Sequence, residues 1–269
     1  MDYIATVGLR ERLGRFERGR PGPRGPPHQP LRWKPSPSAT HEGRQLQVCQ
    51  PFGPHSEHVA SADAALWDAL LLLGPTGSGK TPLGVMLEAR GWHGRPCTHF
   101  DFGAILRAIV RRDRPDELLT RRDLDFLAEV LRRGTLLEDE HFPLAERILR
   151  GFLCDRKVDR STMVVLNGLP RHVGQARALE ALMRVRAVVF LHARAETVWK
   201  RIQANIGGDR TGRDDDDPRS IEAKLALFAE RTAPLLDYYR QRHVPVLRKE
   251  VEASTTAEEL WQWLHEFAA

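Results

Sequence analysis

The sequence predicts an α/β fold with a central, mostly parallel sheet of five strands and helices on both of its faces. From Ala65 onward, short apolar runs alternate with longer stretches of helical periodicity. Such alternation is typical of βαβ units with right-handed crossovers. The apolar runs also lack a polar face, which indicates strands that are buried on both sides. One domain from residue 61 to residue 269 accounts for this pattern.

Strands and helices follow one another in order along this domain. We expect strands at residues 68–73, 97–102, 162–167, 187–192 and 244–248. We expect helices at residues 79–90, 103–113, 123–133, 139–154, 173–184, 195–205, 218–241 and 256–267. Open parallel sheets bind ligands at the carboxyl ends of their strands. The segments that follow the first three strands are therefore the first candidates for a functional site.

Residues 1–60 differ in composition from the rest of the chain. They contain nine of the 18 prolines, and nine Lys or Arg against five Asp or Glu. Such a segment cannot bury enough apolar surface to offset its ordering entropy, so we expect it to be disordered. It is either a dispensable extension or a tether for an anionic partner. It carries most of the net charge of +5, and the nearly neutral remainder does not favour nucleic-acid binding.

Cysteine spacing and hydropathy indicate the cellular setting. Cys49, Cys97 and Cys154 form no CxxC pair, so the sequence predicts neither a disulfide framework nor a zinc site. A reducing cytoplasm suits this usage. No apolar stretch approaches the roughly 18 residues of a membrane-spanning helix. We expect a cytoplasmic monomer that binds neither a membrane nor nucleic acid.

The stretch LLLLGPTGSGKT, residues 70–81, joins the first strand to the first helix. It satisfies the pattern G-x-x-x-x-G-K-[ST], in which glycines let backbone N–H groups surround phosphate oxygens. Lys80 can reach the β- and γ-phosphates, and the Thr81 hydroxyl is placed for Mg²⁺. The motif predicts a nucleoside triphosphate with magnesium and leaves the phosphate acceptor open. The residues expected to bind ATP are Gly74, Pro75, Thr76, Gly77, Ser78, Gly79, Lys80 and Thr81.

Two arginines and a glutamine follow the second and third strands. Arg171 comes directly after the third strand, and its planar guanidinium suits bidentate phosphate binding. Gln175 lies one helical turn later and could read a base edge with its amide. Arg107 lies one turn inside the helix after the second strand. These side chains predict an acceptor site that faces the phosphate loop.

Four further segments carry a family resemblance. They read HFDFGAILRAIV, RRGTLLEDE, LNGLPRHVGQA and TGRDDDDPRSIEAKLALFAERTAPLLDYY. In order and spacing they resemble motifs of the adenylate kinases and the other nucleoside monophosphate kinases, from about Leu70 to Leu264. The resemblance implies a three-layer P-loop kinase fold with a short lid, at about residues 204–216. It also implies transfer of the γ-phosphate of ATP to a nucleoside monophosphate, with Mg²⁺ as cofactor.

The resemblance also implies roles for individual residues. Lys80, Arg107, Arg171 and the lid residue Arg213 would be the catalytic cations, and Arg201 would pack on the ATP base. Asp215 and Asp216 would brace the lid arginines. The monophosphate site would consist of Phe102, Gly103, Arg107, Leu136, Gly168, Arg171, Gln175, Arg213 and Lys224.

Several positions depart from the family pattern. Asn167 stands where an aspartate usually supports magnesium, so we expect it only to hydrogen-bond the water of a metal held by Thr81. Ala104 replaces a second aspartate, and Asp101 is a candidate to compensate. Lys224 replaces a lid arginine. Asn205 falls at another arginine position, for which the nearby Arg210 is a candidate replacement, and Phe102 replaces a threonine near the acceptor base.

These departures keep alternative functions open. Phe102 leaves the acceptor base undecided, so a UMP/CMP kinase or a deoxynucleotide kinase is an alternative to an enzyme that phosphorylates AMP. The loss of carboxylates at residues 104 and 167 raises a second alternative, a catalytically weak nucleotide-binding sensor module.

Overall fold

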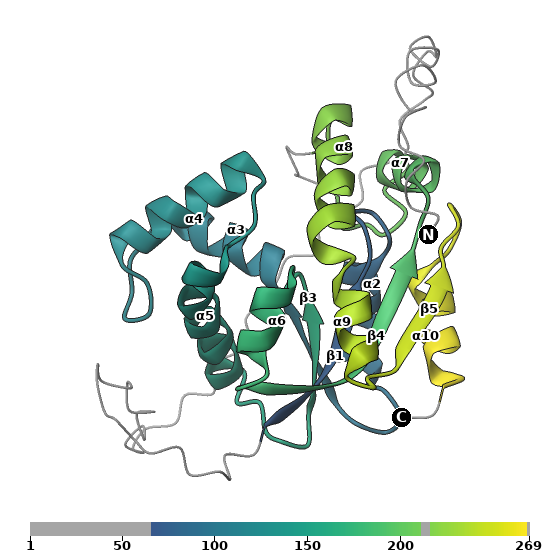
Figure 1. Cartoon of the computed structure of the whole chain (residues 1–269), viewed down its shortest axis with the longest axis horizontal. Coiled ribbons are helices and arrows are strands. Elements are labelled where there is room, and N and C mark those ends of the chain that lie inside the picture. Colours follow the sequence, from purple (N-terminus) through teal and green to yellow (C-terminus); the bar gives the residue numbers. More distant parts are fainter. Residues whose placement is uncertain (1–65, 211–215, 268–269) are drawn as a thin grey trace, which may run out of the picture. The chain divides into compact units, whose positions relative to one another are not determined.

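The computed structural model describes residues 66–210 and 216–267. The expected N-terminal extension and the lid residue Arg213 lie outside the described residues. Figure 1 shows a twisted sheet with helices on both of its faces. The sheet has five parallel strands in the order β2-β3-β1-β4-β5. The α/β fold predicted from the sequence is confirmed.

The strands occur close to where the sequence predicts them. They are β1 (Trp67–Leu73), β2 (Cys97–Asp101), β3 (Met163–Asn167), β4 (Met183–His192) and β5 (Val246–Glu250). The helical elements are α2 (Lys80–Arg90), α3 (Phe102–Arg112), α4 (Arg121–Arg133), the 3₁₀ turn η1 (Asp139–His141), α5 (Phe142–Asp155), α6 (Val173–Leu179), α7 (Ala195–Gln203), α8 (Pro218–Leu227), the π turn η2 (Phe228–Thr232), α9 (Leu235–Gln241) and α10 (Ala257–His265).

The central strand β1 has a hydrophobic core on each side. Leu71 and Leu73 pack into one core, with side chains of α3, α4, α5, α6 and α9. Leu70 and Leu72 pack into the other, with side chains of α2, α7 and α10. Successive side chains of a strand point to opposite faces, so a run of leucines can fill both cores. This explains why the strand has no polar face.

Two predicted boundaries are wrong. Helix α6 ends at Leu179, and β4 begins at Met183 rather than at 187. The exposed Arg184 and Arg186 alternate with more buried neighbours there, and this stretch extends the pairing of β4 with the start of β1. The helix expected over 218–241 is divided into α8, η2 and α9. Pro234 lies at the division, and it cannot donate a helical hydrogen bond.

The segments that the sequence marks as functional meet at one edge of the sheet. The loop after β1, the start of α3 after β2 and the loop after β3 all lie at the carboxyl ends of parallel strands. Within the described residues, no helix has the length and apolar character needed to cross a membrane.

Candidate functional site

The phosphate loop connects β1 to α2 through backbone conformations that favour glycine. Gly74 has a φ of 152°, and an added Cβ would lie 2.5 Å from the carbonyl oxygen of Leu191. Gly79, at the N-cap of α2, has a φ of 99°. A side chain at either position would be strained or would clash. The loop therefore presents its backbone to the pocket, as an anion-binding loop requires.

Lys80 is held across this loop. Its Nζ donates to the carbonyl oxygens of Gly74 and Pro75, at 2.8 and 2.7 Å. Burial, followed by the positive charges of Arg171 and Arg210, lowers the pKa of Lys80 to about 7. The side chains of Lys80, Arg171 and Arg210 thus place three cations in one pocket. Such a cluster is complementary to a polyphosphate, whose negative charge would raise the pKa of Lys80 again.

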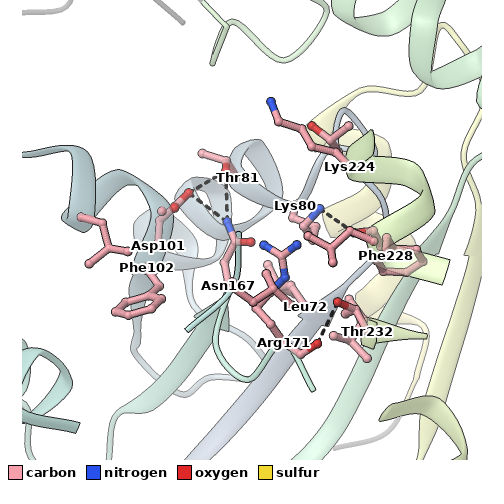
Figure 2. A pocket seen from close by; sticks show the side chains of 18 of the residues that line it. Leu72, Lys80, Thr81, Asp101, Phe102, Asn167, Arg171, Lys224, Phe228 and Thr232 are labelled. Carbon is pink, nitrogen blue, oxygen red and sulfur yellow. Dashed lines mark hydrogen bonds between the residues drawn. The ribbon is translucent and has the colours of Figure 1, made fainter. Parts of the chain in front are cut away.

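The pocket brings together residues that are far apart in the sequence. It is lined by Lys80 from α2, Arg107 from α3 and Arg171 from the loop after β3. Figure 2 shows the Arg171 guanidinium pointing towards Lys80. Burial lowers the pKa of Arg171. The expectation that both arginines face the phosphate loop is therefore consistent with the geometry.

Further site residues of the sequence analysis line the same pocket. They are Gly74, Thr76, Gly77, Gly79, Thr81, Phe102, Gly103, Leu136, Asn167, Gly168, Gln175, Arg201 and Lys224. Pro75 and Ser78 do not line it, although the Pro75 carbonyl holds Lys80. Ser78 is fully buried, and its hydroxyl has no hydrogen-bond partner within the described residues.

Gln175 links the backbone of Arg171 to the backbone of Leu137 on one side of the pocket. Its Oε1 accepts from the backbone N–H of Arg171 at 2.7 Å, and its Nε2 donates to the carbonyl oxygen of Leu137 at 2.8 Å. The Thr232 hydroxyl donates to the Arg171 carbonyl at 2.8 Å. The backbone of Arg171 is thus fixed from α6 and from η2. These two bonds leave one N–H and one oxygen lone pair of the Gln175 amide, which could read a base edge, as the resemblance implies.

Arg210 lies directly over the phosphate loop. Its Nη2 donates to the Thr76 hydroxyl at 3.0 Å, and its Nη1 pairs with Asp216 at 3.0 Å. Its backbone N–H donates to Oδ1 of Asn205 at 3.1 Å. Lys224 lies 3.8 Å from the same Asp216 carboxylate. Arg210 therefore reaches the phosphate loop, and its replacement of an arginine at position 205 stays a prediction.

Arg201 has a role that the sequence analysis missed. Its side chain is buried, and its guanidinium donates to the carbonyl oxygens of Gly77, Glu252 and Thr255 at 2.7 to 2.9 Å. It thus ties the phosphate loop to the segment between β5 and α10. No local motif signals this contact, because the acceptors are backbone groups distant in sequence. Its expected packing on the ATP base stays a prediction.

Thr81, Asp101 and Asn167 form a hydrogen-bonded triad beside the loop, joined by dashed lines in Figure 2. The Thr81 hydroxyl donates to Oδ2 of Asp101 at 2.6 Å. Nδ2 of Asn167 donates to that oxygen at 2.9 Å and to Oγ1 of Thr81 at 3.0 Å. A hydroxyl, a carboxylate and an amide are the oxygen-bearing groups that suit hydrated Mg²⁺. In the described part of the chain, no three His, Cys, Asp or Glu cluster as a metal site.

Comparison with known proteins identifies the family. No family model matches the chain. An adenylate kinase of Xanthomonas campestris pv. campestris (strain 8004) is 34% identical over 180 residues, 64% of this chain and 86% of the relative. An adenylate kinase of Xylella fastidiosa (strain M23) is 28% identical over 183 residues, 65% of this chain and 87% of the relative. The chain belongs to the adenylate kinase family.

Family membership confirms the resemblance stated from the motifs. The ordered segments after β1, β2 and β3 are those that line the pocket, and a phosphate loop with converging arginines can bind and position phosphorylated substrates. Individual roles within the pocket stay predictions. That of Arg213 falls outside the described residues.

Proposed function

We propose that this adenylate kinase family member transfers the γ-phosphate of ATP to a nucleoside monophosphate, and that AMP is the preferred acceptor. The observation that carries the proposal is the convergence of Lys80, Arg107 and Arg171 from three different elements on one pocket. A single triphosphate would not require cations on both sides of the pocket. The relatives named adenylate kinase support AMP as the acceptor.

The residues of the pocket would act by position and charge. Lys80 and the N–H groups of the phosphate loop would hold the β- and γ-phosphates, and Arg107 and Arg171 would hold the acceptor phosphate. Each well-placed cation could contribute roughly 3–4 kcal/mol to transition-state stabilisation. No general base is needed, because the acceptor phosphate oxygen is already ionised.

The donor set next to the loop fits magnesium. Thr81 would be a direct ligand, and Asn167 and Asp101 would hold water of the ion by hydrogen bonds. When bound, Mg²⁺ neutralises charge on the β- and γ-phosphates. Arg210, and Arg213 by resemblance, would add positive charge on the lid side. We further propose that the protein is a cytoplasmic monomer; size-exclusion chromatography with light scattering would test the oligomeric state, and cell fractionation the location.

A coupled assay of ADP formation tests the proposed function. The full chain would be supplied with ATP, Mg²⁺ and, in turn, AMP, UMP, CMP and dAMP. We expect AMP to give the highest rate and Lys80→Ala to reduce it by at least 100-fold, since one lost electrostatic contact of this kind costs about 10²–10³ in rate. If no monophosphate raises ADP formation above the Lys80→Ala background, the kinase proposal is wrong and the sensor alternative is favoured. A higher rate with UMP or CMP would instead correct the acceptor.

A further inference from the structure

We infer that Asp101 supplies the negative charge of the magnesium site, a role that the resemblance assigns to an aspartate at the position of Asn167. The inference rests on the proposed function, since it concerns the metal that accompanies ATP. It adds a positioning residue to that site. Asp101 ends β2 and Asn167 ends β3, so the charge would be displaced by one strand.

The sheet places these two positions next to each other. Asp101 and Asn167 are partners in the parallel register of β2 and β3, and neighbouring strands lie about 4.8 Å apart. Asn167 is also the register partner of Leu72 in β1, directly before the phosphate loop. A carboxylate at either position can therefore reach the same Thr81 hydroxyl.

Hydrogen-bond directions indicate why only one of the two positions is acidic. Oδ2 of Asp101 accepts both from the Thr81 hydroxyl and from Nδ2 of Asn167. An aspartate at 167 would place two carboxylates within hydrogen-bonding distance, where like charges repel. An amide at 167 instead donates to Asp101. The residues at the two positions are thus complementary: the carboxylate at 101 explains why an amide, and not a second carboxylate, stands at 167.

The triad leaves Thr81 oriented for a cation. Because its hydroxyl proton is donated to Asp101, an oxygen lone pair of Thr81 stays available to a metal ion. Among the described residues that line the pocket, Asp101 and Asp209 carry carboxylates. Asp101 accepts a hydrogen bond from Thr81, whereas Oδ2 of Asp209 lies 3.8 Å from Nε of Arg210.

A purely structural role for Asp101 is the competing explanation. Its Oδ1 accepts from the backbone N–H of Ala104 at 2.8 Å and caps α3. Asparagine caps helices about as well as aspartate. The substitution Asp101→Asn therefore removes the charge and keeps the cap. A cap-only role predicts that this variant binds metal like the wild type.

Mn²⁺ binding, measured by electron paramagnetic resonance with a non-hydrolysable ATP analogue, tests the inference without turnover. For Asp101→Asn we expect about 10–100-fold weaker Mn²⁺ binding, the usual cost of losing a group that orients the metal shell. Binding of the analogue in EDTA should be unchanged or tighter, because a negative charge next to the phosphates is gone. The double variant Asp101→Asn/Asn167→Asp restores one acid and one amide, and should recover most of the Mn²⁺ affinity.

The outcomes separate this inference from the proposed function. The inference would be overturned if the Mn²⁺ affinity of Asp101→Asn were within twofold of the wild type. It would also be overturned if the double variant bound Mn²⁺ no more tightly than Asp101→Asn. Asn167→Asp alone creates two adjacent carboxylates. Without metal, its melting temperature should therefore be lower than that of the double variant, and a higher melting temperature would also contradict the inference. A wild type that binds Mn²⁺ with the analogue but phosphorylates no monophosphate would overturn only the proposed function.

Discussion

Replacing Lys80 with methionine should make the nucleotide-free protein more stable. The Lys80 ammonium lies close to Arg171 and Arg210, and its pKa is lowered to about 7, first by burial and then by these two charges. In the folded protein, the charged lysine is therefore less favourable than in the unfolded chain. Methionine has a similar shape and removes the charge.

The structure bounds the size of this effect. A pKa that falls from 10.5 to about 7 corresponds to at most about 5 kcal/mol, at about 1.4 kcal/mol for each tenfold change in proton affinity. Lys80 retains some solvent exposure, which screens its charge, and methionine loses two hydrogen bonds to loop carbonyls. We expect a net gain of about 2 kcal/mol near pH 7, or about 4–8 °C in melting temperature.

The gain in free energy of unfolding should decrease as the pH rises above 7. The cost of the charged lysine is fully present below pH 7 and decreases as the pH rises from 7 to 10.5, where the unfolded chain also loses its proton. At pH 9.5, Lys80→Met should keep about one third of the gain in free energy of unfolding that it shows at pH 7. Thermal unfolding of both full chains, followed by circular dichroism from pH 7 to 9.5 without nucleotide, measures this.

Lys200→Met is the matched control, because Lys200 is an exposed lysine on α7. It should leave the melting temperature within about 1 °C of the wild type, as is usual for exposed positions. The reasoning would be refuted if Lys80→Met were no more stable than the wild type at pH 7. A difference that stayed constant up to pH 9.5 would refute it as well.

Three further substitutions test contacts around the pocket. Gly84→Ala would place a Cβ 2.2 Å from Nε2 of His99, so it should lower the free energy of unfolding by about 2 kcal/mol in urea titrations. In a His99→Ala background the same change should be neutral or stabilising, because alanine favours helix. Arg201→Met leaves buried carbonyl oxygens without their hydrogen-bond donor and should lower the free energy of unfolding by about 3 kcal/mol in the same titrations. Calorimetry should also show weaker ATP binding. An unchanged free energy of unfolding would contradict a stabilising role of these hydrogen bonds. Gln175→Met should raise the KM for the monophosphate at least tenfold, since it frees the backbone of Arg171, and a KM within twofold of the wild type would argue against this role.

Local patterns predicted the fold, and most of the residues that they proposed for the site line one pocket. The phosphate loop could be located because its motif, its preceding strand and its following helix are contiguous. The pocket residues Arg107 and Arg171 could be proposed because parallel strands all deliver their carboxyl ends to one edge. The start of β4 was missed because it depends on pairing with β1. Such pairing joins residues far apart in the sequence.

Side-chain direction marked the limit of sequence reasoning. Asp101 stood out only as a possible substitute for lost carboxylates, since its orientation depends on the cap that it makes to Ala104. Arg201 could not be assigned its backbone contacts, because its acceptors at Glu252 and Thr255 belong to a loop with no motif. These features follow from tertiary packing.

The tie made by Arg201 has a consequence for synthesis of the chain. The phosphate loop follows β1, the first strand of the described residues, but the guanidinium that holds Gly77 is itself anchored on carbonyls of residues 252 and 255. Residues 252 to 255 must leave the ribosome before that anchor can form. A chain that stops before residue 252 would lack these acceptors, so the hold of Arg201 on Gly77 would lose its support.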